Sequence, residues 1–255
     1  MAAEKTLAIV LRTIAFGETS SIVTLCCREF GKLRALAKGA WRPKSSFDGG
    51  LDLLSISQVL VLRRASGGLD LLTEAALEHR FRVGGSLPAV LGGLHVAELL
   101  DAFTADADPH PELFDVAQTT LRRLSDWRGD DRAVPAILLR FELTLLRLVG
   151  HAPQTGQCVE CGGPLDAAGR TPFGLLEGGT LCGRCRSGRP AVAMLSAEAL
   201  AAIRHGVTPD TPTIELPARA IAEARSVITT AIAHLLGRPT RVASRLRRPA
   251  RRRTS

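Results

Sequence analysis

Four cysteines between residues 158 and 185 constrain the fold more than any other feature of the chain. They form two pairs, Cys158-Val-Glu-Cys161 and Cys182-Gly-Arg-Cys185, with twenty residues between them. Two CxxC pairs at this spacing are typical of a tetrahedral zinc site. Four cysteine ligands leave no open position for water, so we expect the ion to stabilise the fold and not to catalyse a reaction.

Two other interpretations of the cysteines have to be weighed against zinc. Disulfides are disfavoured because residues 1–5 and the short apolar run after them do not resemble a signal peptide, and cytosolic thiols stay reduced. A redox site needs only one CxxC motif, and no βαβ pattern surrounds either pair. His151, seven residues before Cys158, is a weaker candidate for contact with the zinc ligands. The turn-rich segment between the pairs predicts a short hairpin closed by the metal.

The net charge is concentrated at the C-terminus. The formal charge is +8, and residues 238–255 contain eight arginines and no acid. Removing these eight from the 33 basic residues leaves 25 against 25 acidic residues in 1–237. An arginine-rich segment with two prolines predicts a disordered tail that binds polyanions, nucleic acid in particular. The alternative is a tail that only increases solubility.

The first eighty residues predict about five short strands joined by glycine- and proline-containing turns. This number is that of an OB-type barrel. The segments show the alternation or the short apolar runs expected of strands in a small barrel. They are residues 7–11, 21–27, 32–37, 53–62 and 69–77.

Five cations and one tryptophan on a predicted strand and the loop after it are the candidate nucleic-acid contacts. Lysine and arginine neutralise backbone phosphates, and tryptophan stacks on an unpaired base. Two alternatives remain: the cations are solvated side chains on the outer face of a barrel, or the tryptophan is a core or hinge residue. The six residues are Lys32, Arg34, Lys38, Trp41, Arg42 and Lys44.

After residue 86 the apolar period changes from that of strands to that of helices. Helices are predicted over residues 87–103, 112–127, 134–149, 196–205 and 217–236. We therefore expect an α+β multidomain chain. Its predicted parts are an OB-type DNA-binding barrel (1–82), a helical domain in two parts (83–157 and 191–237), an inserted four-cysteine zinc module (158–190) and the disordered arginine-rich tail (238–255).

The residues do not indicate an enzyme. The glycine-rich stretches lack the Lys-Ser/Thr of a P-loop, and the six histidines have neither metal-ligand nor triad spacing. No apolar run is long enough to span a membrane. We expect no catalytic residue, no membrane partner and a cytoplasmic, nucleoid-associated protein.

A series of short motifs runs through most of the chain. In the first half they are Ala8-Ile-Val-Leu11, Gly17-Glu18, Arg28-Glu-Phe-Gly-Lys32, Ala37-Lys-Gly-Ala40, Arg42-Pro-Lys-Ser45 and Leu72-Thr-Glu74. In the second half they are Arg140-Phe-Glu-Leu143, Leu145-Leu146, Gly150-His-Ala-Pro153 and Cys158-x-x-Cys161-Gly162. Their order over nearly all of residues 1–237 resembles the bacterial recombination mediator family RecO.

This resemblance implies a DNA repair protein that is not an enzyme. Such proteins bind single- and double-stranded DNA, anneal complementary strands and act with RecR to load RecA onto strands coated by single-strand binding protein. The family is described as an OB barrel, a helical domain and a zinc-binding insert. Carried over residue by residue, the resemblance assigns zinc to the four cysteines, and DNA contact to Lys32, Arg34, Lys38, Arg42 and Lys44.

The resemblance also implies a partner for the helical domain. We expect it to offer an apolar groove to the acidic and apolar tail of single-strand binding protein, with Arg122, Arg123 or Arg140 meeting the acids. Two other function classes are kept open. One is a zinc-ribbon adaptor of transcription or translation that contacts nucleic acid only through its tail. The other is a thiol redox enzyme, which tightly held stoichiometric zinc would argue against.

Overall fold

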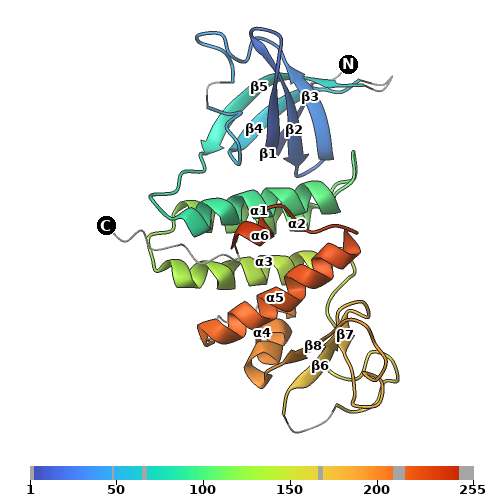
Figure 1. The fold of residues 1–255 in the computed structure, drawn as a ribbon. Coiled ribbons are helices and arrows are strands. Elements are labelled where there is room, and N and C mark those ends of the chain that lie inside the picture. The colour runs from blue at the N-terminus through green and yellow to red at the C-terminus, as the bar shows by residue number, and fades with distance from the viewer. Residues whose placement is uncertain (1–2, 48, 65–67, 166–168, 209–215, 247–255) are drawn as a thin grey trace. The chain divides into compact units, whose positions relative to one another are not determined.

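The chain forms two compact units, which are described separately. The computed structural model describes residues 3–47, 49–64, 68–165, 169–208 and 216–246. Its contacts divide the chain into unit 1, Met1–Arg128, and unit 2, Gly129–Ser255. Unit 1 contains a β-barrel and two helices, and unit 2 contains helices and a small sheet (Figure 1). The boundary falls within the segment predicted as the first part of the helical domain.

Five strands of unit 1 close into the barrel that the sequence predicts. They are β1 (Ala3–Phe16), β2 (Ser20–Cys27), β3 (Gly31–Ala37), β4 (Ile56–Leu62) and β5 (Asp70–His79). Their order around the barrel is β1-β2-β3-β5-β4, and the β3–β5 pairing is parallel whereas the others are antiparallel. A five-stranded closed barrel confirms the OB-type prediction.

Strand alternation decides which side chains of β3 face water. Leu33, Ala35 and Ala37 are buried in the barrel core, together with Val23 and Leu25 of β2. The intervening residues of β3 point outward, as expected for a period of two. This places Lys32 and Arg34 on the outer face, on the side predicted from the sequence.

β1 is longer than its predicted core because it has two partners in succession. It pairs with β4 over Ala3–Ile9 and with β2 over Ala8–Phe16, with a shift in register between Val10 and Arg12. Beyond the shift, its last residues pair in the sheet with β2 alone. The start of β2 also pairs with β3, from Ser21 onward, so the end of β1 is an edge of the sheet here. The hairpin made by the end of β1 and the start of β2 is called the β1–β2 ribbon below.

Two helices complete unit 1, α1 (Leu87–Phe103) and α2 (Pro111–Ser125). The hydroxyl of Ser86 caps α1 by accepting from the backbone N–H of Ala89, and a proline follows in the first turn. The loop after α1 lies against the start of β3, where the Ala107 N–H donates to the Lys32 carbonyl at 2.9 Å. Gly31, at φ 70°, has to be glycine here, because a Cβ would lie 2.3 Å from the Asp108 carbonyl oxygen.

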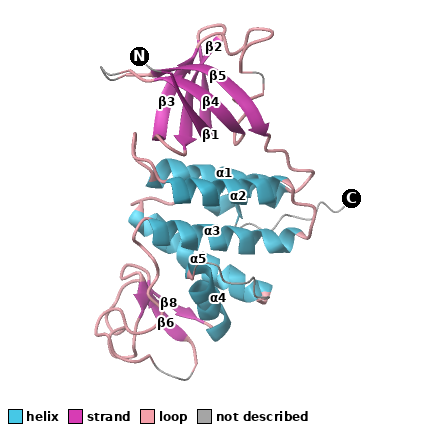
Figure 2. Cartoon of the chain, turned by 180° about the vertical axis from the view of Figure 1, so that it is seen from behind, coloured by secondary structure: helices cyan, strands magenta, loops and turns pink. Residues whose placement is uncertain are grey.

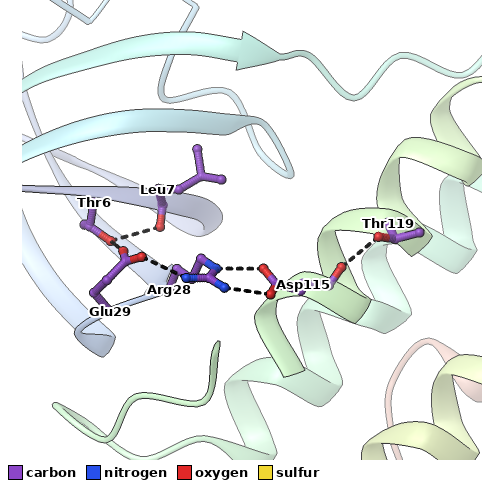
Figure 3. A network of polar contacts seen from close by, with 6 residues as sticks. All are labelled: Thr6, Leu7, Arg28, Glu29, Asp115 and Thr119. Carbon is purple, nitrogen blue, oxygen red and sulfur yellow. Dashed lines mark hydrogen bonds and ion pairs between the residues drawn. The ribbon is translucent and has the colours of Figure 1, made fainter. Parts of the chain in front are cut away.

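Ion pairs join the barrel to both helices. Arg28, which follows β2, donates from Nε and Nη2 to the two carboxylate oxygens of Asp115 on α2, at 2.8 and 2.9 Å (Figure 3). This bidentate hydrogen bonding by the guanidinium holds the pKa of Asp115 below its ordinary value. Asp101 of α1 accepts from Arg12 of β1 and from Lys32 of β3.

Unit 2 begins with the short 3-10 helix η1 (Asp131–Ala133) and α3 (Val134–Leu148). The cysteine segment then carries β6 (Thr171–Gly174) and β7 (Gly179–Thr180), and β8 (Val192–Leu195) completes a three-stranded antiparallel sheet. The strand order is β7-β6-β8, and Figure 2 shows β6 and β8 side by side. The predicted hairpin between the cysteine pairs is the β6–β7 pair. Helices α4 (Ala197–Val207) and α5 (Ala218–Leu235) pack against α3 and each other.

The start of the predicted disordered tail contains the short helix α6 (Ala243–Leu246). Thr240 and Ala243 are buried, so this stretch is ordered, in contrast to the prediction. Residues 247–255, with the remaining arginines, lie outside the described residues. No helix in the described part of the chain is long and apolar enough to cross a membrane.

A buried ion pair links α3 to α5 in unit 2. Arg225 donates to both carboxylate oxygens of Glu142, at 3.2 and 2.7 Å. The side chain of Glu142 is 0% exposed and that of Arg225 is 11% exposed. Both charges are desolvated and each is compensated by the other. Removal of either side chain therefore leaves a buried charge without a partner.

We predict that Glu142→Leu destabilises unit 2 by about 3–5 kcal/mol, because the Arg225 guanidinium then stays buried without its carboxylate. Urea unfolding measures the change. The double variant Glu142→Leu/Arg225→Met removes both charges and is expected to recover much of the loss. A single variant as stable as the wild type would contradict this role of the pair.

Candidate metal centre and nucleic-acid interface

The four predicted cysteine ligands meet at one point in unit 2. Cys158, Cys161, Cys182 and Cys185 bring their sulfur atoms within 4.8 Å of one another, and all four are free thiols. The sulfurs of Cys161 and Cys182 are 3.9 Å apart. A tetrahedral ion with metal–sulfur bonds of ~2.3 Å requires sulfur–sulfur edges of ~3.8 Å. The arrangement therefore has the dimensions of a four-cysteine metal site.

Tight turns place the sulfurs. The Gly162 N–H donates to the Cys158 carbonyl at 2.9 Å, and the Cys158 N–H donates to the Gly163 carbonyl at 2.9 Å. Gly162 has a φ of 66°, which other residues adopt only with strain. The second pair lies beside β7, where Leu181 is fully buried in a small cluster with Cys158 and Cys182.

The electrostatics of the four thiols favour a bound cation. Burial opposes ionisation of Cys158, but backbone N–H groups of Cys161, Cys182 and Glu160 donate to its sulfur and lower its pKa to about 6. The neighbouring sulfurs of Cys182 and Cys161 raise the pKa of Cys185 to about 12. Four crowded sulfurs cannot all carry a negative charge unless a positive ion lies between them.

Contacts outside the sulfurs fix the two turns to the hairpin. Arg189 bridges Glu160, inside the first CxxC pair, at 2.7 Å and Glu177, between β6 and β7, at 3.1 Å. The Thr180 N–H of β7 donates to the Gln154 carbonyl at 2.8 Å, just before the first pair. His151 does not belong to the cysteine cluster; it lines a separate apolar hollow of about 390 Å³.

The predicted nucleic-acid residues lie on β3 and in the loop after it, but their surroundings differ. Arg34, Lys38, Arg42 and Lys44 are exposed, and no carboxylate within the described residues is in contact with them. Lys32 differs, because its side chain is only 15% exposed. Its ammonium donates to the Asp101 carbonyl at 2.7 Å and lies 3.4 Å from the Asp101 carboxylate.

Trp41 is exposed, so it is not a core residue of the barrel. It lines a hollow of about 430 Å³ together with Arg42 and Lys44. Arg80, which the sequence analysis did not single out, lines the same hollow and pairs with Asp52 at 3.0 Å. The local sequence does not indicate a role for Arg80. Arg80 directly follows β5 and lies beside the loop after β3 only through the fold of the barrel.

Comparisons with known proteins agree with this arrangement. A family model described as Recombination protein O N terminal matches residues 1–81, and one described as Recombination protein O C terminal matches residues 85–243. A Rhodopirellula baltica protein named DNA repair protein RecO is 41% identical over 201 residues, which cover 78% of this chain and 73% of that protein. A relative of the same name from Anaeromyxobacter dehalogenans is 34% identical over 236 residues, 90% of each chain. A third, from Syntrophus aciditrophicus, is 28% identical over 93% of this chain and 92% of its own.

We predict that the purified wild-type chain holds one tightly bound metal ion and that Cys158→Ser loses it, because three thiolates bind the ion far more weakly than four. Metal content by mass spectrometry measures the loss, and circular dichroism measures the accompanying unfolding of the module. Cys26→Ala, which removes a buried barrel cysteine outside the cluster, is the matched control. Full metal content in Cys158→Ser would contradict the site.

Proposed function

Because the chain belongs to the RecO family of DNA repair proteins, we propose that it binds single- and double-stranded DNA and anneals complementary strands. The observation that carries the proposal is the set of exposed cations on and after β3. Lysine and arginine side chains without a carboxylate partner are free to replace the counterions of DNA phosphates. The proposed contacts are Arg34, Lys38, Arg42 and Lys44, with Trp41 beside them.

Lys32 has a different part in this proposal. Its ammonium is held by Asp101 of α1, and transfer to a phosphate would first break that contact. We therefore assign Lys32 to positioning β3 against α1 and the other cations to the DNA itself. Substitution of Lys32 can therefore be compared with the same substitution of Lys38, which has no such contact.

Annealing follows from neutralisation of phosphates on two strands at once. Two single strands repel each other through their backbones, and bound cations remove part of that repulsion. Strands held on one surface meet at a raised effective concentration, after which complementary bases pair without an energy source. No catalytic group is required, and the protein acts as a mediator.

Three protein partners complete the proposal. RecR acts with this chain, and together they help to load RecA onto strands coated by single-strand binding protein. The acidic and apolar tail of that binding protein needs an apolar hollow, and unit 2 has one lined by Leu146, Phe173, Leu175 and Leu235. His151 and His234 also line this hollow, whereas Arg122, Arg123 and Arg140, the arginines predicted to meet the acids, are not among its lining residues.

We propose that the metal is Zn²⁺ and that its role is structural. Four cysteine ligands with a tetrahedral sulfur arrangement suit zinc, and the site has no place for a water ligand. The cluster beneath it is small, with Cys158, Leu181 and Cys182 as its buried members. A module with so little apolar core depends on the ion for its stability.

A second candidate is an adaptor that binds nucleic acid only through its C-terminal arginines. The arginine-rich composition of residues 238–255 favours it. In that case the barrel cations are solvated side chains with no role in binding. Its zinc module would then be the surface that contacts other proteins.

We predict that Lys38→Glu/Arg42→Glu slows annealing of complementary oligonucleotides by at least about tenfold and reduces the salt dependence of single-strand binding by ~0.7 per cation removed. Arg132→Glu makes the same type of change at an exposed arginine outside the barrel and is expected to anneal normally. Lys32→Gln should lower thermal stability and change DNA affinity less than Lys38→Gln. Normal annealing by the double variant would remove the barrel from this account.

We predict that deleting residues 247–255 weakens DNA binding without abolishing it. The deletion removes five arginines and keeps all of the described residues, α6 included. In the mediator interpretation the barrel still binds DNA, and fluorescence anisotropy detects a reduced affinity. Complete loss of binding would favour the adaptor interpretation.

A further inference from the structure

Large apolar side chains are exposed at the end of the β1–β2 ribbon. Phe16 is 53% exposed and Ile14 is 49% exposed, and both belong to the last residues of β1. Directly opposite residues of paired strands point to the same face, and here Ile14 faces Ile22 while Phe16 faces Ser20. The inner face of β2 holds the buried Ser21 and Val23 instead. The ribbon therefore presents an apolar outer face to solvent.

The loop after β3 joins this ribbon through two hydrogen bonds. The Trp41 N–H donates to the Thr19 carbonyl at 3.0 Å, and the Gly39 N–H donates to the Ser20 hydroxyl at 3.2 Å. Trp41 is 62% exposed. The ring of Trp41 and the ring of Phe16 thus come from adjoining segments that are bonded to each other at the ribbon tip.

The exposed cations of the proposed interface flank the same place. Lys38, Arg42 and Lys44 belong to the loop that carries Trp41, and Arg42 and Lys44 share its hollow. The cations nearer the helices are paired: Arg12 and Lys32 with Asp101, and Arg28 with Asp115. Two acids of the described residues lie at this end: Glu18 in the ribbon turn, and Asp52, which lines the hollow and pairs with Arg80 at 3.0 Å. Free positive charge and exposed rings therefore coincide at one end of the barrel.

We propose that Phe16 and Trp41 form a stacking surface for unpaired bases, so that this end of the barrel prefers single-stranded over double-stranded nucleic acid. The surface consists of Ile14, Phe16, Lys38, Trp41, Arg42 and Lys44. The inference rests on the proposed function, since it assigns further residues and a strand preference to the same interface.

Chemistry distinguishes a single strand from other occupants. A single strand offers phosphates to the cations and the flat faces of its bases to the rings. A duplex offers the same phosphates but keeps its base faces inside the stack, so exposed rings gain little from it. Three free cations around apolar side chains would suit only an acidic protein partner, and the acidic tail of single-strand binding protein is assigned above to the apolar hollow of unit 2.

Tryptophan fluorescence tests stacking at Trp41 directly, because the chain has two tryptophans, Trp41 and Trp127. In full-length Trp127→Phe protein, all tryptophan emission comes from Trp41. An oligothymidylate is expected to quench that emission as it binds, and a duplex of equal length is expected to quench it much less at equal occupancy. Emission that does not respond, while anisotropy reports single-strand binding, would overturn the inference.

Affinity measurements test Phe16. Phe16→Ala and Trp41→Ala are each expected to lower single-strand affinity by about tenfold, to leave duplex affinity within about twofold and to keep the salt slope unchanged, because no charge is removed. Leu87→Ala is the matched control, since Leu87 is a 61% exposed apolar residue at the start of α1.

The outcomes separate this inference from the proposed function. If Lys38→Glu/Arg42→Glu loses binding while both ring variants bind as the wild type does, DNA binding stands and the stacking surface is wrong. The exposed rings would then be assigned to a protein contact. If the wild type binds neither single strands nor duplex, the proposed function fails together with the inference.

Discussion

Carboxylates of α1 and α2 determine which cations of the barrel remain available. Asp101 forms ion pairs with Arg12 and Lys32, and Asp115 forms one with Arg28. Partly exposed pairs of this kind add no more than about 1 kcal/mol each to stability. Their larger effect is on the distribution of charge, because they neutralise the end of the barrel next to the helices and leave Lys38, Arg42 and Lys44 unpartnered among the described residues.

Unit 2 combines two parts that differ in how much apolar surface they bury. Its helices bury a continuous apolar face and a buried ion pair, whereas the cysteine module has too few apolar residues for a core of its own. Small modules of this kind need a metal or disulfides to offset the entropy of folding. An ion bound by the four convergent sulfurs would supply that stabilisation. The bridge from Arg189 to Glu160 and Glu177 links the turns to the hairpin.

Local signals account for what the sequence predicted well. The start of α1 follows from the Ser86 cap and the proline after it, and the cysteine cluster follows from its CxxC spacing. Long-range pairing accounts for the rest. The engagement of Lys32 depends on Asp101, which is 69 residues away, and the length of β1 depends on two different partner strands. Neither the contact of Lys32 with Asp101 nor the full length of β1 can be recognised from the residues of the segment itself.

The central claim is that the chain brings complementary strands together through its exposed cations, without an energy source. It is tested most directly with complementary oligonucleotides precoated with the cognate single-strand binding protein, mixed with and without this chain in the absence of ATP. The account predicts that the folded, metal-loaded chain accelerates annealing. An annealing rate that does not change would contradict the claim, and would favour the adaptor interpretation, in which the cysteine module binds protein partners.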